Sequence, residues 1–130
     1  MNNSNTTLID FEQGLRHCDQ QTATYRAVLQ AFYEQYTQTA LLDATTSDEA
    51  IYHQLHSLKG LSATIGAQPL SDLAADLFKN WTTVDKSKRN AALADLQVQL
   101  DAVLVTINQH LTQNIWSNFG QSFLFFVIIC

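Results

Sequence analysis

The stretch that decides the fold of this chain spans residues 51–67 and has the sequence IYHQLHSLKGLSATIGA. Apolar and small residues recur in it at spacings of three and four, which is the period of an amphipathic α-helix. On a helical wheel one stripe of them falls within roughly 80° of arc. The stripe consists of Ile51, Leu55, Leu58, Ser62 and Ile65. His56 then lies roughly 140° from the centre of this stripe and Gly60 about 180°. We therefore predict a helix that buries the stripe and turns His56 to solvent.

The predicted surroundings of His56 on this helix offer a nucleophile, a cation and an open approach. Residues three and four apart are neighbours on a helix surface, so the residues expected around it are Tyr52, His53, Lys59, Gly60 and Ala63. A neutral imidazole is a usable nitrogen nucleophile at cellular pH. Lys59 would place a positive charge beside any anion attached to His56.

Gly60 is the unexpected member of this group. Glycine costs about 0.8–1 kcal/mol relative to alanine inside a helix. On a solvated face it therefore indicates that something large approaches the backbone there. Phosphoryl transfer needs mainly positioning and charge stabilisation. Together these residues favour a phosphoryl group that is exchanged with another protein.

Residues 56–67 resemble the motif of histidine-containing phosphotransfer (HPt) domains, which is roughly His-x-Leu-Lys-Gly-x-Ser/Ala-x-x-Ile/Leu-Gly-Ala. The motif aligns with the chain from His56 without a gap, and residues 25–32 are also similar to the family. A following helical pattern of the family matches Leu70, Leu73, Ala74 and Leu77. The likeness covers roughly residues 8–113. It implies a phospho-accepting His56, a Lys59 that favours the phosphorylated state, and a Gly60 that admits a receiver domain.

The resemblance implies a phosphorelay intermediate in two-component signal transduction. His56 would accept a phosphoryl group from a receiver-domain phosphoaspartate and pass it to another receiver domain. The implied partners are response-regulator receiver domains and a hybrid sensor kinase, with Mg²⁺ on the receiver domain and no cofactor on this chain. No Gly-rich phosphate loop or nucleotide signature occurs in the sequence. We therefore expect a histidine phosphotransfer protein that is not an enzyme and has no kinase motifs.

Phe78 departs from the family pattern, because many members carry Gln or Glu at the corresponding position. We predict that Phe78 lies at the rim of the His56 site and adds apolar docking area. Lys79 is the nearest polar side chain in the sequence. The predicted partner-binding surface thus comprises Tyr52, His53, Ala63, Phe78 and Lys79.

Length and composition favour a single all-α domain. The chain has 130 residues, which is enough for one hydrophobic core and too few for two. It contains only one proline and four glycines, which favours helices. The net charge of −5 argues against nucleic acid as the main partner. The local basic run of Lys86, Lys88 and Arg89 is interpreted as the solvated start of a helix.

The predicted architecture is an up-down antiparallel four-helix bundle with a short extra N-terminal helix. The extra helix is expected near residues 8–17 with Leu8 on its apolar face, and the next helix after Thr22. The last long helix follows a connection at residues 82–85. Its apolar stripe comprises Leu93, Leu96, Leu100, Val103, Ile107 and Leu111.

Local signals define the limits of the two central helices. Thr46 and Glu49 predict a capping box at the start of the helix that carries His56. Gly66 is expected to end that helix in a left-handed cap. Pro69 fits the first turn of the following helix, which is expected to end at about Asn80.

The two ends of the chain differ in character. Residues 1–7 are polar and are predicted to be a disordered lead-in, residues 8–115 form the bundle, and residues 116–130 are an apolar tail of unknown role. The uninterrupted apolar run at 123–130 is far short of the roughly 20 residues that span a bilayer. Three alternatives stay open for it: it covers an open end of the bundle, it mediates self-association, or it is incidental. Two cysteines without a disulfide framework fit a reducing cytoplasm.

Two alternatives to phosphotransfer remain. One is a non-catalytic helical protein-interaction module, which an exposed Tyr52 and the apolar tail would suit. The other is a metal-binding helical protein that uses His53 and His56, although two ligands make a poor structural site. Residues 17–19 cannot chelate one ion from a helix, because adjacent side chains point about 100° apart. His110 is expected to complement the helix dipole late in the last helix.

Overall fold

The computed structural model describes residues 7–38 and 47–119, which contain helices and no strand. The α-helices are α1 (Phe11–His17), α2 (Thr22–Gln38), α3 (Asp48–Ile65), α4 (Gln68–Asn80) and α5 (Lys86–Phe119). A short 3₁₀ helix, η2 (Trp81–Thr83), joins α4 to α5. The predicted all-α class is therefore confirmed.

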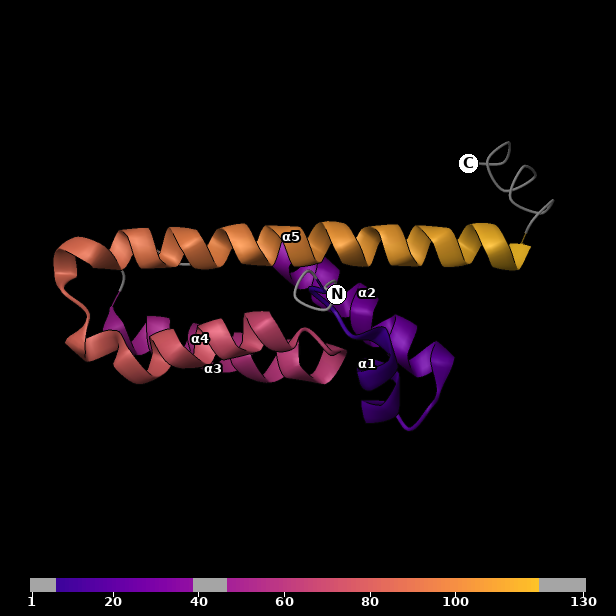
Figure 1. The fold of residues 1–130 in the computed structure, drawn as a ribbon, viewed down its shortest axis with the longest axis horizontal. Helices are drawn as coiled ribbons and strands as arrows, with labels where there is room; N and C mark the ends of the chain where they lie inside the picture. The colour runs from indigo at the N-terminus through magenta and orange to yellow at the C-terminus, as the bar shows by residue number, and fades with distance from the viewer. Residues whose placement is uncertain (1–6, 39–46, 120–130) are drawn as a thin grey trace.

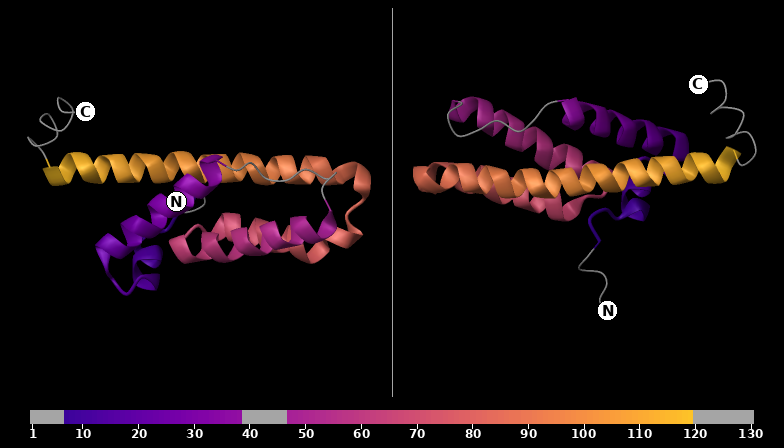
Figure 2. Two further views of the ribbon diagram at one scale, coloured as in Figure 1. Left: turned by 180° about the vertical axis from the view of Figure 1, so that it is seen from behind. Right: turned by 90° about the horizontal axis from the view of Figure 1, so that it is seen from above.

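The long helices alternate in direction around a shared core. In Figure 1, α3 and α4 lie side by side along the first half of α5, while α1 and α2 lie toward its second half. α2 and α4 run opposite to α3 and α5, and α2 crosses α5 obliquely (Figures 1 and 2). The most extensive interface joins α3 to α4, and α5 packs against both α2 and α4. This is the predicted up-down bundle with a short helix added at its N-terminus.

The stripe on α3 is buried as the helical period predicts. Its five members are at most 1% exposed, and they are Ile51, Leu55, Leu58, Ser62 and Ile65. The six residues predicted on α5 are buried too, with Leu104 as an additional member. α3 therefore presents its opposite side, with His56, to solvent.

The ends of α3 are fixed by a cap at each terminus. The N-cap is Ser47, whose Oγ accepts the Ala50 N–H at 3.2 Å. The predicted cap, Thr46, is one residue too early and lies outside the described residues. Gly66 ends the helix with φ = 93°, as predicted. A Cβ there would also collide with the Asp10 carbonyl, so the position needs glycine for both its conformation and its space.

α1 begins later than predicted, because Asp10 caps it. The Asp10 carboxylate accepts the Gln13 N–H at 3.1 Å, and the Asp10 N–H donates to the Gly66 carbonyl at 2.8 Å. These bonds fix Asp10 in extended backbone. Leu8 consequently precedes the helix, although it still packs against the core.

α1 is anchored on the bundle through a group that we call the α1 junction, which comprises Phe11, Gly14, Tyr25, Ile65 and His110. The Tyr25 hydroxyl donates to the Ile65 carbonyl at 2.7 Å. Burial, and then the nearby Cys18 and Asp10, raise the pKa of this hydroxyl well above its usual range. Gly14 is buried against the same carbonyl, with which a Cβ at this position would collide. α1 therefore sits as close to the end of α3 as its backbone allows.

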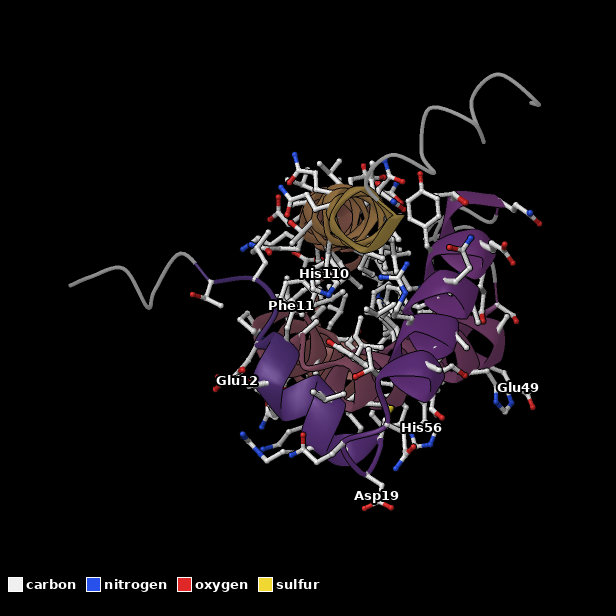
Figure 3. All side chains as sticks on the ribbon, turned by 90° about the vertical axis from the view of Figure 1, so that its right-hand side faces the viewer. Phe11, Glu12, Asp19, Glu49, His56 and His110 are labelled. Atoms are coloured by element: carbon white, nitrogen blue, oxygen red, sulfur yellow. The ribbon has the colours of Figure 1, made fainter. Side chains whose placement is uncertain are left out.

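His110 belongs to this junction and does not act as a helix-end cation. α5 continues beyond it to Phe119, so the predicted contact with the helix terminus is wrong. The imidazole instead stacks on the Phe11 ring, with a centroid distance of 3.9 Å and an interplanar angle of 12° (Figure 3). Burial, and then the charge of Arg26, lower its pKa.

A polar cluster joins the turn between α4 and α5 to the start of α3, with Arg89 buried and Asp48 exposed. Trp81 is fully buried, and its Nε1–H donates to the Asp48 carboxylate at 2.9 Å. Arg89 donates to the same carboxylate at 3.3 Å and to the Trp81 carbonyl at 3.0 Å. With 8% exposure Arg89 is buried, which corrects its interpretation as solvated; Lys86 and Lys88 are exposed as expected.

None of the helices in the described part of the chain combines the length and apolar character that a membrane crossing requires. Most of the predicted polar lead-in (residues 1–7) and of the apolar tail (residues 116–130) lies outside the described residues.

Candidate functional site

His56 stands on the outer side of α3, remote from α5 and from the Phe11–His110 pair (Figure 3). Its orientation follows from the buried stripe, because the helix can bury only one side against α4 and the core. The side chain is exposed, and no hydrogen bond joins it to another residue in the described part of the chain. The imidazole is therefore free for contact with an incoming molecule.

α4 places the aromatic ring of Phe78 beside this histidine. The Phe78 ring is half-buried, and its centroid lies 5.8 Å from that of His56. Tyr52 meets the same Phe78 ring edge-on at 5.3 Å. With His53 and Lys79 these residues line an open hollow of about 460 Å³. The hollow brings together four of the five residues predicted to bind a partner, and the prediction that Phe78 lies beside His56 is confirmed geometrically.

Two of the predicted neighbours lie differently from expectation. Tyr52 is half-buried and packs against the core, because its ring fills the gap between α3 and Phe78. The exposed Tyr52 of the interaction-module alternative is therefore not observed. Ala63 is half-buried and does not line the hollow.

Gly60 leaves the approach to His56 open. A Cβ built on it would meet nothing within 4 Å, so no packing within the described residues requires glycine. Its carbonyl accepts the Thr64 hydroxyl at 3.0 Å, a bond from the next turn of the same helix. The prediction that Gly60 faces open space is thus confirmed.

Lys59 lies between the hollow and the interface of α3 with α4. The side chain is half-buried, and its Nζ is 5.9 Å from the centroid of the Phe78 ring. Its carbonyl accepts the Ser71 hydroxyl at 2.8 Å, which ties the two helices together beside the site. Ser71 is only 3% exposed, and the sequence analysis missed it; a serine in the apolar period of α4 was its only signal.

The charge around the site is cationic, although the whole chain has a net charge of −5. Lys79, Lys59 and the two histidines are the ionisable groups around the hollow besides the Tyr52 phenol, and no carboxylate lines it. In the described ranges no group of three or more His, Cys, Asp or Glu side chains could hold a metal ion. The arrangement is suited to an anion delivered to an exposed imidazole.

Comparison with known proteins supports this geometry. A family model, described as the Hpt domain, matches residues 15–113 of the chain. The match includes α2, α3, α4 and most of α5, and therefore the whole surface around His56. No curated protein and no solved structure matches the chain significantly.

Proposed function

Because this chain belongs to the Hpt domain family, we propose that His56 accepts a phosphoryl group from the phosphoaspartate of one receiver domain and passes it to another. Hpt domains are phosphotransfer modules of two-component signalling that interact with receiver domains and have no kinase activity. The observation that carries the assignment to His56 is its exposure on a helix whose next turn, at Gly60, presents bare backbone.

The proposed transfer is a displacement at phosphorus. The unprotonated ring nitrogen of His56 attacks in line, the bond from phosphorus to the aspartate oxygen breaks, and the carboxylate leaves. Mg²⁺ on the receiver domain neutralises charge on the phosphoryl oxygens. This chain supplies the nucleophile and, through Lys59, a cation beside the phosphorylated ring, and it needs no cofactor of its own.

The aromatic hollow supplies docking area in this proposal. Tyr52 and Phe78 offer apolar surface next to the nucleophile, and His53 and Lys79 add polar contacts at its edge. Ala63 extends the same surface along α3. Response regulators and a hybrid sensor kinase are the proposed sources and recipients of the phosphoryl group, and the cytoplasm is the proposed location.

Replacement of His56 tests the proposal directly. His56→Gln should abolish receiver-dependent phosphorylation while its thermal melt stays as in the wild type, because the side chain is solvated. His17→Gln is the control for transfer, since His17 is also exposed but lies on α1, where its Nδ1 is 3.1 Å from the Thr64 carbonyl oxygen. The measurement is transfer from a panel of phosphorylated receiver domains, with acid lability identifying phosphohistidine.

The outcomes separate the two main interpretations. If His56→Gln still accepts the phosphoryl group, or unfolds, the assignment is wrong. If no receiver phosphorylates the wild type, yet receivers bind it and His56→Gln equally, the chain is an interaction module without transfer.

A further inference from the structure

One aromatic ring on α4 contacts a row of three side chains on α3. The Phe78 ring lies 5.3 Å from Tyr52, 5.8 Å from His56 and 5.9 Å from the Lys59 ammonium nitrogen. The three partners follow one another at spacings of four and three, so they share one face of the helix. A single ring therefore touches both the nucleophile of the proposed function and its neighbouring cation.

The Phe78 ring is itself held in place. It is half-buried and packs against the core, and Tyr52 meets it edge-on with an interplanar angle of 69°. The bond from the Ser71 hydroxyl to the Lys59 carbonyl fixes α4 against α3 a short distance away. The ring is thus packed more tightly than the His56 side chain, which is exposed.

No hydrogen bond joins the His56 imidazole to another of the described residues. Lys59 likewise forms no salt bridge there. The face of an aromatic ring attracts a cation, and a ring packed against an imidazole restricts its rotamers. The Phe78 ring is therefore a contact that both groups share.

From these contacts we propose that Phe78 is a positioning residue, which holds the His56 imidazole and the Lys59 ammonium in the geometry that stabilises a phosphoryl group on His56. The inference rests on the proposed function of His56. Phe78 does not touch the phosphoryl group in this scheme; it orders both side chains, and it stabilises the phosphorylated state through Lys59. The effect is distinct from docking area, because it persists when no receiver domain is present.

The first test measures order at His56 in the unphosphorylated chain. Three-bond NMR couplings report the χ1 rotamer populations of His56 and Lys59. Phe78→Leu removes the ring but keeps apolar volume, and should shift both side chains toward averaged couplings. Phe78→Tyr keeps the ring and should restore the wild-type values, while Phe78→Met is a second variant without a ring. Unchanged couplings in both variants without a ring would overturn the proposal.

The second test loads His56 without a receiver domain, using phosphoramidate. Its P–N bond breaks, ammonia leaves, and the phosphoryl group bonds to the unprotonated ring nitrogen. Phosphohistidine on Phe78→Leu should hydrolyse several-fold faster than on the wild type, and Phe78→Tyr should match the wild type. In a Lys59→Ala background Phe78→Leu should have no further effect. An equal effect in both backgrounds would show that Phe78 does not act through Lys59.

The matched control is Phe11→Leu, which removes a ring that stacks on another histidine, His110, and lies away from the site. It should leave the phosphohistidine lifetime unchanged. The two proposals fail separately. Wild-type lifetime in Phe78→Leu with normal transfer from receivers overturns the positioning role alone. A lifetime that depends on Phe78, with no transfer from any receiver, overturns the phosphorelay alone.

Discussion

A histidine, a phenylalanine and a helical glycine occur together at two places in this molecule. At the His56 site the rings of His56 and Phe78 are 5.8 Å apart and tilted by 44°, and a Cβ on Gly60 would meet nothing within 4 Å. At the α1 junction the rings of His110 and Phe11 stack at 3.9 Å. There a Cβ on Gly14 would collide with the Ile65 carbonyl and the Tyr25 ring.

The same three residue types serve close packing at the α1 junction and leave open space at the His56 site. At the α1 junction each of the three residue types has a structural role, because stacking and close backbone contact hold α1 on the bundle. At the His56 site the same residue types leave a ring nitrogen and a stretch of backbone exposed. Residue composition alone therefore does not distinguish the two places; the space around the glycine does.

The largest expected effect comes from filling the open space at the His56 site. Gly60→Glu should lower receiver-dependent phosphorylation by about 100-fold, because a side chain one turn from His56 displaces the incoming phosphoaspartate. Its melting temperature should stay close to that of the wild type. Gly60→Ala should stabilise the fold by up to about 1 kcal/mol, since the helix interior penalises glycine.

Ala91→Glu is the control for this experiment, because it adds the same charge at an exposed position of α5. It should transfer as the wild type does. A wild-type transfer rate for Gly60→Glu would show that receiver domains dock elsewhere. Gly60 would then have no role in access, and its contrast with the packed Gly14 would be lost.

The reverse result is expected at the α1 junction. Gly14→Ala should cost about 1–3 kcal/mol of unfolding free energy, as overpacking typically does, because its Cβ meets backbone at Ile65. Urea unfolding measures the loss, and the folded fraction should still accept the phosphoryl group. A Gly14→Ala variant as stable as the wild type would show that α1 moves away from α3 without cost.

Helical periodicity predicted most of the fold because it depends on spacing alone. The buried stripe of α3, the left-handed cap at Gly66 and the proline in the first turn of α4 all follow from local rules, and all three are observed. The exposure of His56 was predicted from the same helical period, because the residue lies opposite the buried stripe of α3. The site could therefore be located from one helix.

The errors arose where a residue's role depends on a distant partner. Arg89 is buried because two acceptors satisfy its guanidinium group. The Asp48 carboxylate is far from it in sequence, and the Trp81 carbonyl lies across the turn. His110 stacks on Phe11 from the opposite end of the chain. Tyr52 is half-buried because Phe78 comes from the next helix. None of these pairings has a periodic signal in the sequence.

A smaller effect is expected from the cation of the His56 site. Lys59→Ala should still accept the phosphoryl group but should destabilise the phosphorylated state by about 1 kcal/mol, the scale of a partly exposed charge pair. Transfer equilibria with one receiver domain, measured at two salt concentrations, test this. Lys88→Ala removes an exposed lysine of α5 and is the control. An equilibrium unchanged at both salt concentrations would exclude a role for Lys59.

The smallest expected effect is a pH dependence of stability at the α1 junction. Burial, and then the charge of Arg26, lower the pKa of His110 below its ordinary value of 6.5. Between the folded and unfolded pKa values the unfolded chain therefore binds more protons, and stability falls as the pH drops through that interval. Urea midpoints between about pH 5 and pH 7.5 should show this decline in the wild type and a shallower one in His110→Gln. Gln109→Ala, which changes an exposed residue next to His110 that does not titrate, should keep the wild-type slope. If the stability of His110→Gln changes with pH as steeply as that of the wild type, the stacked imidazole does not cause the pH dependence. His56 and His110 would then differ only in how exposed they are.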